Sequence, residues 1–205
     1  MRLTLALPAG RALAADVDEA DEAVGRMLLE RLATTASALP AGASTTVDVD
    51  WATVQLRAAG QLVTAEEPGY GRDGEQFHPS LARTSNIWAA QQQLIAQLNV
   101  EPESVTATQF VHVSTGAMAA AEVVGHRGDD ASGPFTGWTV VSTTDVPETA
   151  SFGYYTVREL ARQRPAWLAA MILPRSWSFR FSRSTLVDCV SPAGETYAIG
   201  LSIPL

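Results

Sequence analysis

One stretch of this 205-residue chain, residues 137–181, constrains its fold more than any other. It opens with Gly137-Trp138 at the start of a strand, passes through an acidic turn, and continues with an amphipathic helix that begins near Thr156. A proline and then alternating aromatic residues mark a new strand from about residue 176. Strands that enclose a helix in this way pack most readily as an antiparallel, curved sheet with a covering helix. The stretch therefore predicts an α+β fold.

Further strands are expected on both sides of this helix, so the second half of the chain should be mainly β-structure. Pro165 either kinks the helix or starts a second one that covers residues 166–172. The strands expected in this half span residues 106–114, 119–126, 137–142, 176–182, 185–190 and 195–203.

The first half of the chain alternates strand and helix patterns. An apolar run at residues 3–7 precedes an amphipathic helix over about 19–37. Two strands over 45–57 and 61–66 follow, and then a helix over 79–99. This βαββα order is ferredoxin-like, and the β-rich run after the second helix would complete it.

The polar segment at residues 101–104 is the best candidate for a boundary between the two halves. It divides the chain into an uncharacterised α+β domain of residues 1–103 and a second α+β domain of residues 104–205. The strand that would complete the ferredoxin-like order already belongs to the second half. The halves therefore either form separate domains or share one sheet.

The charge of the chain favours protein partners over nucleic acid. Its formal net charge is −8, and all 14 of its basic residues are arginine. Phosphate contacts need a surplus of basic residues, so we expect no nucleic-acid binding, whereas a basic protein would be attracted. The N-terminal apolar run is too short for a secretion signal, and no run approaches the ~18 residues of a membrane span. With Cys189 as the single cysteine, we expect a cytoplasmic protein without membrane contact.

The histidines do not form a metal-binding motif. His78, His112 and His126 lie in different settings, and none has a second histidine or a cysteine pair at the spacing of zinc ligands. We therefore expect no metal and no cofactor.

Two sets of residues could be combined into a catalytic site, although neither has a local motif. Ser114, His126 and Asp188 could form a triad, and Cys189 with His126 and Asp145 a thiol site. The serine lacks a nucleophile elbow. Cys189 alternates with apolar neighbours on an expected strand, which indicates a buried structural thiol. We expect no catalytic residue and no enzyme.

The adjacent tyrosines Tyr154 and Tyr155 are candidates for contact with a partner. Consecutive residues of a strand point to opposite faces, so both cannot be buried in the same core. The other aromatic residues of this half, Phe152 included, are expected to be mostly core residues.

Six arginines between residues 158 and 183 make one segment basic within an acidic chain. They either pair with carboxylates of the first half, such as those at residues 16–22, or form a site for an anionic ligand or partner.

The order of motifs in the second half resembles a known bacterial domain. A strand pair at 110–114 and 120–126 leads through the acidic loop 128–133 to Gly137-Trp138. Later motifs are Ser151-Phe152-Gly153-Tyr154-Tyr155 and Pro174-Arg175-Ser176-Trp177-Ser178-Phe179. Over about residues 108–205 this pattern resembles the predicted immunity protein family 33 of polymorphic toxin systems. The chain departs from the pattern by lacking a glycine before Ser176 and by having His126-Arg127 where the family has Arg-Glu.

The resemblance implies a non-enzymatic immunity protein that binds and neutralises a cognate toxin, which the charge of the chain suggests is basic. Residues on expected loops and edges of this half would then contact the toxin, namely Asp129, Asp130, Asp145, Tyr154 and Tyr155.

The sequence is also compatible with two other functions. One is a structural or assembly component of a phage-like particle or secretion apparatus, and the other is a small hydrolase. An immunity gene should lie beside a toxin gene, an assembly gene in an operon of structural genes, and a hydrolase should have a deep pocket with converging polar groups.

Overall fold

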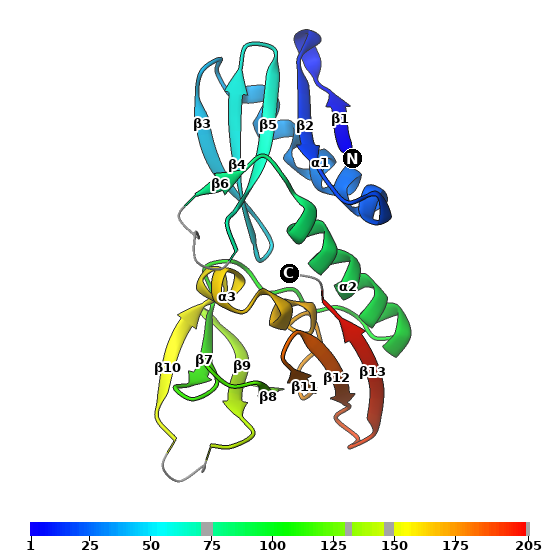
Figure 1. Ribbon diagram of the computed structural model, residues 1–205, viewed down its shortest axis with the longest axis vertical. Helices are drawn as coiled ribbons and strands as arrows, with labels where there is room; N and C mark the ends of the chain where they lie inside the picture. The colour runs from blue at the N-terminus through cyan, green and yellow to red at the C-terminus, as the bar shows by residue number, and fades with distance from the viewer. Residues whose placement is uncertain (71–75, 130–132, 146–149, 204–205) are drawn as a thin grey trace.

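Two β-sheets and the helices packed against them make up the computed structural model, which describes residues 1–70, 76–129, 133–145 and 150–203 (Figure 1). Residues 2–78 supply the strands of the first sheet, and residues 110–202 supply those of the second. The two sheets lie at opposite ends of the molecule in Figure 1, with helices between them. The expected α+β fold is confirmed.

The first sheet has the strand order β1-β2-β5-β4-β3, with β6 paired to the end of β5. It is a mixed sheet, because β2 and β5 run parallel while the other pairs run antiparallel. The strands are β1 (Arg2–Ala6), β2 (Ala12–Asp16), β3 (Ser44–Val49), β4 (Ala52–Ala59), β5 (Leu62–Pro68) and β6 (Phe77–His78).

Helix α1 (Glu22–Ala38) packs against β1 and β2, and helix α2 (Ala82–Leu98) packs against α1. Leu28 and Leu32, one turn apart on α1, are fully buried, as the amphipathic pattern predicts. A Cβ atom on Gly25 would lie 2.8 Å from the Val17 side chain, so glycine allows the helix to approach the sheet closely. In the described part of the chain, no helix combines the length and apolar character that a bilayer span requires.

The ferredoxin-like order expected for residues 1–103 is corrected by the structure. A second strand, β2, forms a hairpin with β1 before α1 begins, and it occupies the place beside β5. Its sequence, Ala-Leu-Ala-Ala-Asp, has low strand propensity, but Leu13, Ala14 and Ala15 are completely buried. The strand that was expected to complete the order, β7, belongs to the second sheet.

The second sheet has the strand order β10-β7-β9-β8-β11-β12-β13. A strand lies at each of the six ranges expected for this half, and β10 is an addition to them. The strands are β7 (Phe110–Ser114), β8 (Glu122–Arg127), β9 (Phe135–Ser142), β10 (Phe152–Thr156), β11 (Ser178–Ser182), β12 (Thr185–Val190) and β13 (Thr196–Ser202).

The second sheet is also mixed, which corrects the expectation of a purely antiparallel sheet. After β7, the chain forms β8 two positions away in the sheet, and β9 then lies between the two. Strand β9 runs antiparallel to β8 and parallel to β7. The other neighbours in this sheet are antiparallel.

A short helix, α3 (Val157–Gln163), follows β10 directly. Its N-terminus has a capping box, in which Thr156 Oγ1 accepts from Glu159 N–H and a Glu159 carboxylate oxygen accepts from Thr156 N–H at 2.7 Å. Pro165 starts a separate 3₁₀ helix, η3 (Pro165–Ala169), in agreement with the second of the two expected alternatives.

Helix α2 joins the two halves, because it packs on α1 of the first half and on η3 of the second. Gln91 Nε2 of α2 donates a hydrogen bond of 2.7 Å to the Leu168 carbonyl of η3. Buried apolar residues of both halves form one continuous core. The division into domains 1–103 and 104–205 stays a prediction. In that division, α2 belongs to the first domain and contacts the second.

Two arginines of residues 158–183 pair with carboxylates of the first half, Arg158 with Asp48 and Arg175 with Glu103, although the carboxylates of residues 16–22, which were named as examples, are not their partners. The distance between Arg158 and Asp48 is 2.8 Å. Arg180 pairs with Asp188 of the neighbouring strand, and Arg164 donates to the carbonyls of Met118 and Ala120. Asp16 and Glu22 pair with Arg2 and Arg26 close to them in the first half.

One buried arginine connects the linker between the halves to the second sheet. Arg127, at the end of β8, is 2% exposed. Its guanidinium donates to the carbonyls of Thr136 at 3.0 Å, Glu103 at 2.8 Å and Leu173 at 2.7 Å, and it pairs with the Glu103 carboxylate at 3.2 Å. Burial lowers the pKa of Arg127, while the charge of Glu103 opposes this shift. The ion pair and three hydrogen bonds compensate for burying the charge.

We expect Arg127→Leu to lower the free energy of unfolding by about 3–5 kcal/mol, because it leaves buried carbonyls without donors. Arg127→Lys should restore little of this stability, since a single ammonium group cannot reproduce the planar fork of donors. Urea unfolding followed by circular dichroism measures both changes.

The matched control is Arg180→Leu, which removes an arginine from the solvent-facing side of the same sheet. Its side chain is 44% exposed, so its loss should destabilise the protein less than the loss of Arg127, even though Asp188, 15% exposed, loses its partner. Similar losses for Arg127→Leu and Arg180→Leu would show that the buried network has no special role.

Candidate functional site

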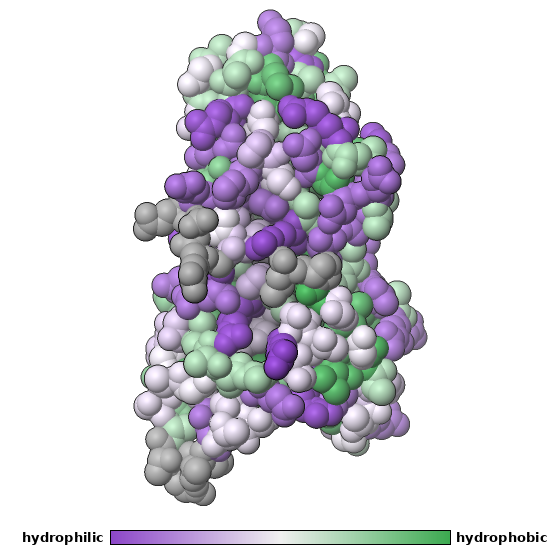
Figure 2. All heavy atoms as spheres, in the orientation of Figure 1, coloured by the Kyte–Doolittle hydropathy of each residue, from purple (hydrophilic) through white to green (hydrophobic). Residues whose placement is uncertain are grey.

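The second sheet has one buried face and one face that no described helix covers. Along β9, Thr136, Trp138 and Val140 are buried, while Phe135 and Thr139, on the other face, are not. The buried face packs into the core that contains α3 and η3. In Figure 2, hydrophobic residues also reach the surface in the half that holds this sheet, whereas hydrophilic residues are densest around the first sheet.

Five aromatic side chains from three neighbouring strands meet on the uncovered face. His112 of β7 stacks on Phe152 and Tyr154 of β10, with ring centroids 4.5 and 5.0 Å apart. Phe135 of β9 lies 5.6 Å from Tyr154 and 6.1 Å from Phe110 of β7. We call this group, Phe110, His112, Phe135, Phe152 and Tyr154, the aromatic patch.

The aromatic patch contains most of the exposed large hydrophobic side chains of the described residues. Tyr154 is 62% exposed, Phe135 43% and Phe152 40%, and Met1 is the fourth in this class. Aromatic rings that stay in contact with water gain none of the free energy of burial, which is about 25 cal/mol for each Å² of apolar surface. Contiguous apolar surface of this kind is typical of protein–protein contact sites.

The register of the strands explains why the patch forms here. His112 pairs with Tyr154 across β7 and β10, and Phe110 pairs with Phe135 across β7 and β9. Directly paired residues of neighbouring strands point to the same face. The patch therefore follows from the parallel pairing of β7 and β9, which brings Phe135 beside Phe110.

The structure brings Tyr154 into the patch and turns Tyr155 away from it. Tyr155 is half-buried and packs against the core, so the expectation that the two tyrosines point to different faces is confirmed. Phe152 is exposed, which corrects its expected place in the core. Trp138, Trp167, Phe179 and Phe181 are buried as expected.

The predicted acidic contacts lie at opposite ends of the strands. Asp129 follows β8 at the end where β7 and β9 begin, is exposed, and accepts a hydrogen bond of 2.6 Å from Ser176 Oγ. Asp145 lies where β7 and β9 end, and its carboxylate accepts from Ser114 Oγ and from Ser142 N–H. Asp145 is therefore engaged inside the protein. Asp130 lies outside the described residues.

Neither candidate catalytic set is assembled. Ser114 donates to Asp145, Asp188 pairs with Arg180, and His126 Nδ1 lies 2.9 Å from Ser178 Oγ. Cys189 is fully buried, and burial, reinforced by the negative charge of Asp188, raises the pKa of its thiol to about 12. No group of three or more His, Cys, Asp or Glu side chains that could hold a metal ion is found in the described segments.

Sequence reasoning missed four of the five patch residues. The signal that could have found Phe110 and His112 is their alternation with Val111 and Val113, which are buried. Alternation separates the two faces of a strand, but it does not tell which face other elements cover.

Comparison with known proteins supports a family assignment for part of the chain. Residues 90–191 match the family model of the Imm33-like domain, from the middle of α2 to just past β12. The resemblance to immunity protein family 33 is thereby confirmed for a segment that begins earlier and ends earlier than expected. No curated protein and no solved structure matches the chain.

We expect the stability of the protein to fall as the pH rises above about 9, in part because of Cys189. The unfolded thiol ionises near 8.5, whereas the folded thiol keeps its proton to about pH 12, so the unfolded state binds fewer protons in this range. The contribution of one such group is at most about 1.4 kcal/mol per pH unit.

Melting temperatures between pH 8 and 11 test this expectation. Cys189→Ala should be less stable at pH 8, where it leaves a small cavity, but its decline with pH should be shallower than that of the wild type. Parallel curves for the two proteins would contradict an ionisation linked to this residue.

Proposed function

We propose, from the match of residues 90–191 to the Imm33-like domain, that this protein is a bacterial immunity protein that binds and neutralises a cognate toxin domain. In this proposal it acts by binding and not by catalysis, needs no cofactor, and works in the cytoplasm. The observation that supports it best is the aromatic patch, all of whose residues lie inside the matched segment.

The patch has the chemical character of a binding centre. Aromatic side chains bury much apolar area at low cost in conformational entropy, and they are enriched among residues that dominate binding energies. Tyr154 combines the largest exposure in the patch with a hydroxyl group that can bond to a partner. We therefore propose Tyr154 as the main anchor, and Tyr155 as a support that packs behind it.

The charge of the protein complements a basic partner. With a formal charge of −8, the protein attracts a basic toxin domain over a distance of about a Debye length, which raises the association rate. Asp129 is exposed at the end of the sheet where β7 and β9 begin and is proposed as a direct contact, as is Asp130 beside it in the sequence. For Asp145 we propose a positioning role, since its carboxylate holds the end of β9 against Ser114.

Tyr154→Ala should weaken binding to the toxin domain encoded beside this gene by about 2 kcal/mol, or roughly 30-fold in Kd, mainly through faster dissociation. Tyr154→Phe should retain most of the affinity, because it preserves the ring. Surface plasmon resonance with the purified toxin domain measures both rates. As a control, Tyr197→Ala on β13, outside the matched segment, should leave binding unchanged.

Asp129→Asn and Asp145→Asn should have different effects. Asp129→Asn should slow association and flatten its dependence on salt, without changing stability. Asp145→Asn should lower the melting temperature, because an amide replaces the acceptor used by Ser114 and Ser142. Equal effects of the two substitutions on association, with unchanged melting curves, would count against the separate roles.

Co-expression decides the function itself. A neighbouring gene product that kills cells alone and is harmless with this protein supports immunity. If the neighbour is harmless on its own, or kills equally well in the presence of this protein, the immunity proposal fails.

A further inference from the structure

Half of the arginines in the basic segment of residues 158–183 make no ion pair within the part of the chain that the structure describes. The other three pair with carboxylates, as described above. The three without such a partner are Arg162, Arg164 and Arg183. Unpaired arginines in a chain with a net charge of −8 raise the question of what anion they bind.

Arg164 and Arg183 line the same pocket, whose volume is about 380 Å³. Its walls come from residues 119–121 before β8, residues 163–167 around the start of η3, and residues 183–184 in the β11–β12 turn. The backbone N–H of Arg183 donates to the Ala121 carbonyl, which joins two of these walls. Among the described residues that line this pocket there is no aspartate or glutamate. The pocket is therefore positively charged inside an acidic protein.

The guanidinium of Arg164 is fixed along one edge and free at its third nitrogen. Its Nε donates to the Met118 carbonyl at 2.8 Å, and its Nη2 donates to the carbonyls of Met118 and Ala120. Its Cζ lies 5.6 Å from the centre of the Trp167 ring, which also lines the pocket. In the described segments Nη1 has no hydrogen-bond partner, and it is not enclosed by other atoms. Nη1 is thus held at the wall of the pocket and is available to an acceptor.

The charge of Arg164 is only partly compensated by its two carbonyl partners. Burial lowers the pKa of Arg164, and no charge of a described residue offsets this shift. An anion in the pocket would favour the charged form of the guanidinium, because an opposite charge nearby compensates for lost hydration. Arg183 is exposed at the rim and adds a second positive charge.

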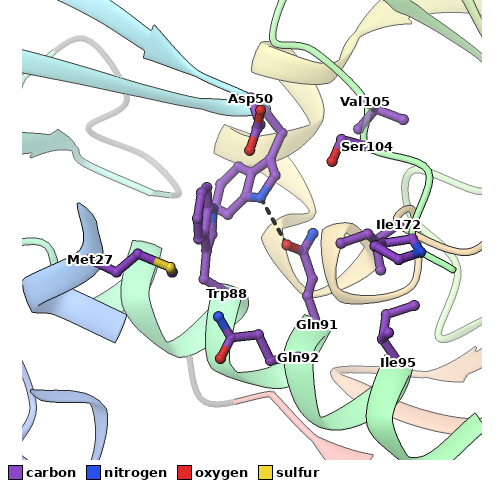
Figure 3. Close-up of a pocket in the computed structure, with 11 residues that line it drawn as sticks. Met27, Asp50, Trp88, Gln91, Gln92, Ile95, Ser104, Val105 and Ile172 are labelled. Atoms are coloured by element: carbon purple, nitrogen blue, oxygen red, sulfur yellow. Dashed lines mark hydrogen bonds between the residues drawn. The ribbon is translucent and has the colours of Figure 1, made fainter. Parts of the chain in front are cut away.

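The pocket between the two halves, drawn in Figure 3, lacks such free charges. There Trp51 Nε1 donates to Gln91 Oε1 at 3.3 Å, and the Gln91 amide donates in turn to the Leu168 carbonyl. Asp50 is the charged residue among the described residues that line it, and its carboxylate pairs with Arg31 at 2.9 Å. A charged ligand would lose hydration in that pocket without gaining a partner. The pocket of Arg164 and Arg183 is therefore the better candidate for a ligand site.

We infer that the pocket of Arg164 and Arg183 binds a small organic carboxylate with a flat apolar body. The two oxygens of a carboxylate match the two arginines, with which they form charge-assisted hydrogen bonds. The body would pack against the Trp167 ring and the alanine and proline side chains of the walls. An apolar cavity of about 150 Å³ is large enough for benzene, so this pocket has room for a ring that carries a carboxylate. The inference is independent of the proposed immunity function.

Two probes of the same shape test the inference on the full chain. Benzoate carries the carboxylate, and benzamide has an uncharged amide in its place. Dissociation constants from ligand-observed NMR, measured at pH 7 and constant salt, should show benzoate binding about 10-fold more tightly. The reason is that hydrogen bonds between ionised partners are about twice as strong as those between neutral ones.

Substitutions at two exposed positions of the pocket should remove this preference without unfolding the protein. Arg183→Gln removes the positive charge at the rim, and Ala119→Glu places a carboxylate on the wall where it competes with the ligand. Arg164→Gln should have the same effect on binding, although it also removes the hydrogen bonds to the Met118 carbonyl. The matched control is Arg2→Gln, which makes the same change of charge at a half-exposed side chain of the first sheet and should leave the preference unchanged.

Three results would overturn the inference. The first is the absence of saturable binding of benzoate to the wild-type protein, and the second is equal affinity for benzoate and benzamide. The third is a preference for benzoate that survives both Arg183→Gln and Ala119→Glu, or that is lost equally in Arg2→Gln. Melting curves of all four variants show whether each is folded, and toxin binding that persists in Ala119→Glu would separate this site from the proposed function.

Discussion

The buried guanidinium of Arg127 is the interaction on which the arrangement of the two halves depends. It stands where β8, β9, the linker and the segment after η3 converge, and it bonds to a carbonyl of each of the last three. A buried charge is tolerable only where its partners are placed closely around it, so this residue restricts where Glu103 can lie. Because Glu103 follows α2 by only a few residues, the same restriction limits how α2 enters the second half. Residues of α2, the linker and the segment after η3 also line a pocket between the halves.

Both faces of the second sheet carry aromatic side chains, but only one face is packed in the core. Its inner face carries Trp138, Phe179 and Phe181, which are packed in the core. The opposite face of β10, β7 and β9 carries a second set of aromatic rings, which no described helix covers. Stability alone does not require exposed phenylalanines, and a binding role gives a reason for them. The unequal use of the two faces is a physical property of this chain.

Much of the fold could be predicted from the sequence, because it rests on local patterns. The stripe of Leu28 and Leu32 predicts α1, Gly60 marks the β4–β5 hairpin, and Pro165 separates α3 from η3. Strand order could not be predicted, since the parallel pairs β2–β5 and β7–β9 join segments whose partners are chosen by packing over long distances. The same limit applies to the candidate site. Tyr154 was identified because it adjoins Tyr155, while Phe135 and Phe152 become exposed only through the way the helices cover a single face.

The position of α2 between the two halves has a consequence for the synthesis of the protein. The side of α2 that receives η3 is made about 70 residues before η3 itself. At translation rates of roughly 5–20 residues per second, this surface stays uncovered for on the order of several seconds. During that interval the nascent first half leaves exposed the part of α2 around Gln91, the residue that later donates to the Leu168 carbonyl. Early termination within the second half would therefore release a product in which this surface of α2 is uncovered, and such a product should aggregate and not form a stable shortened protein.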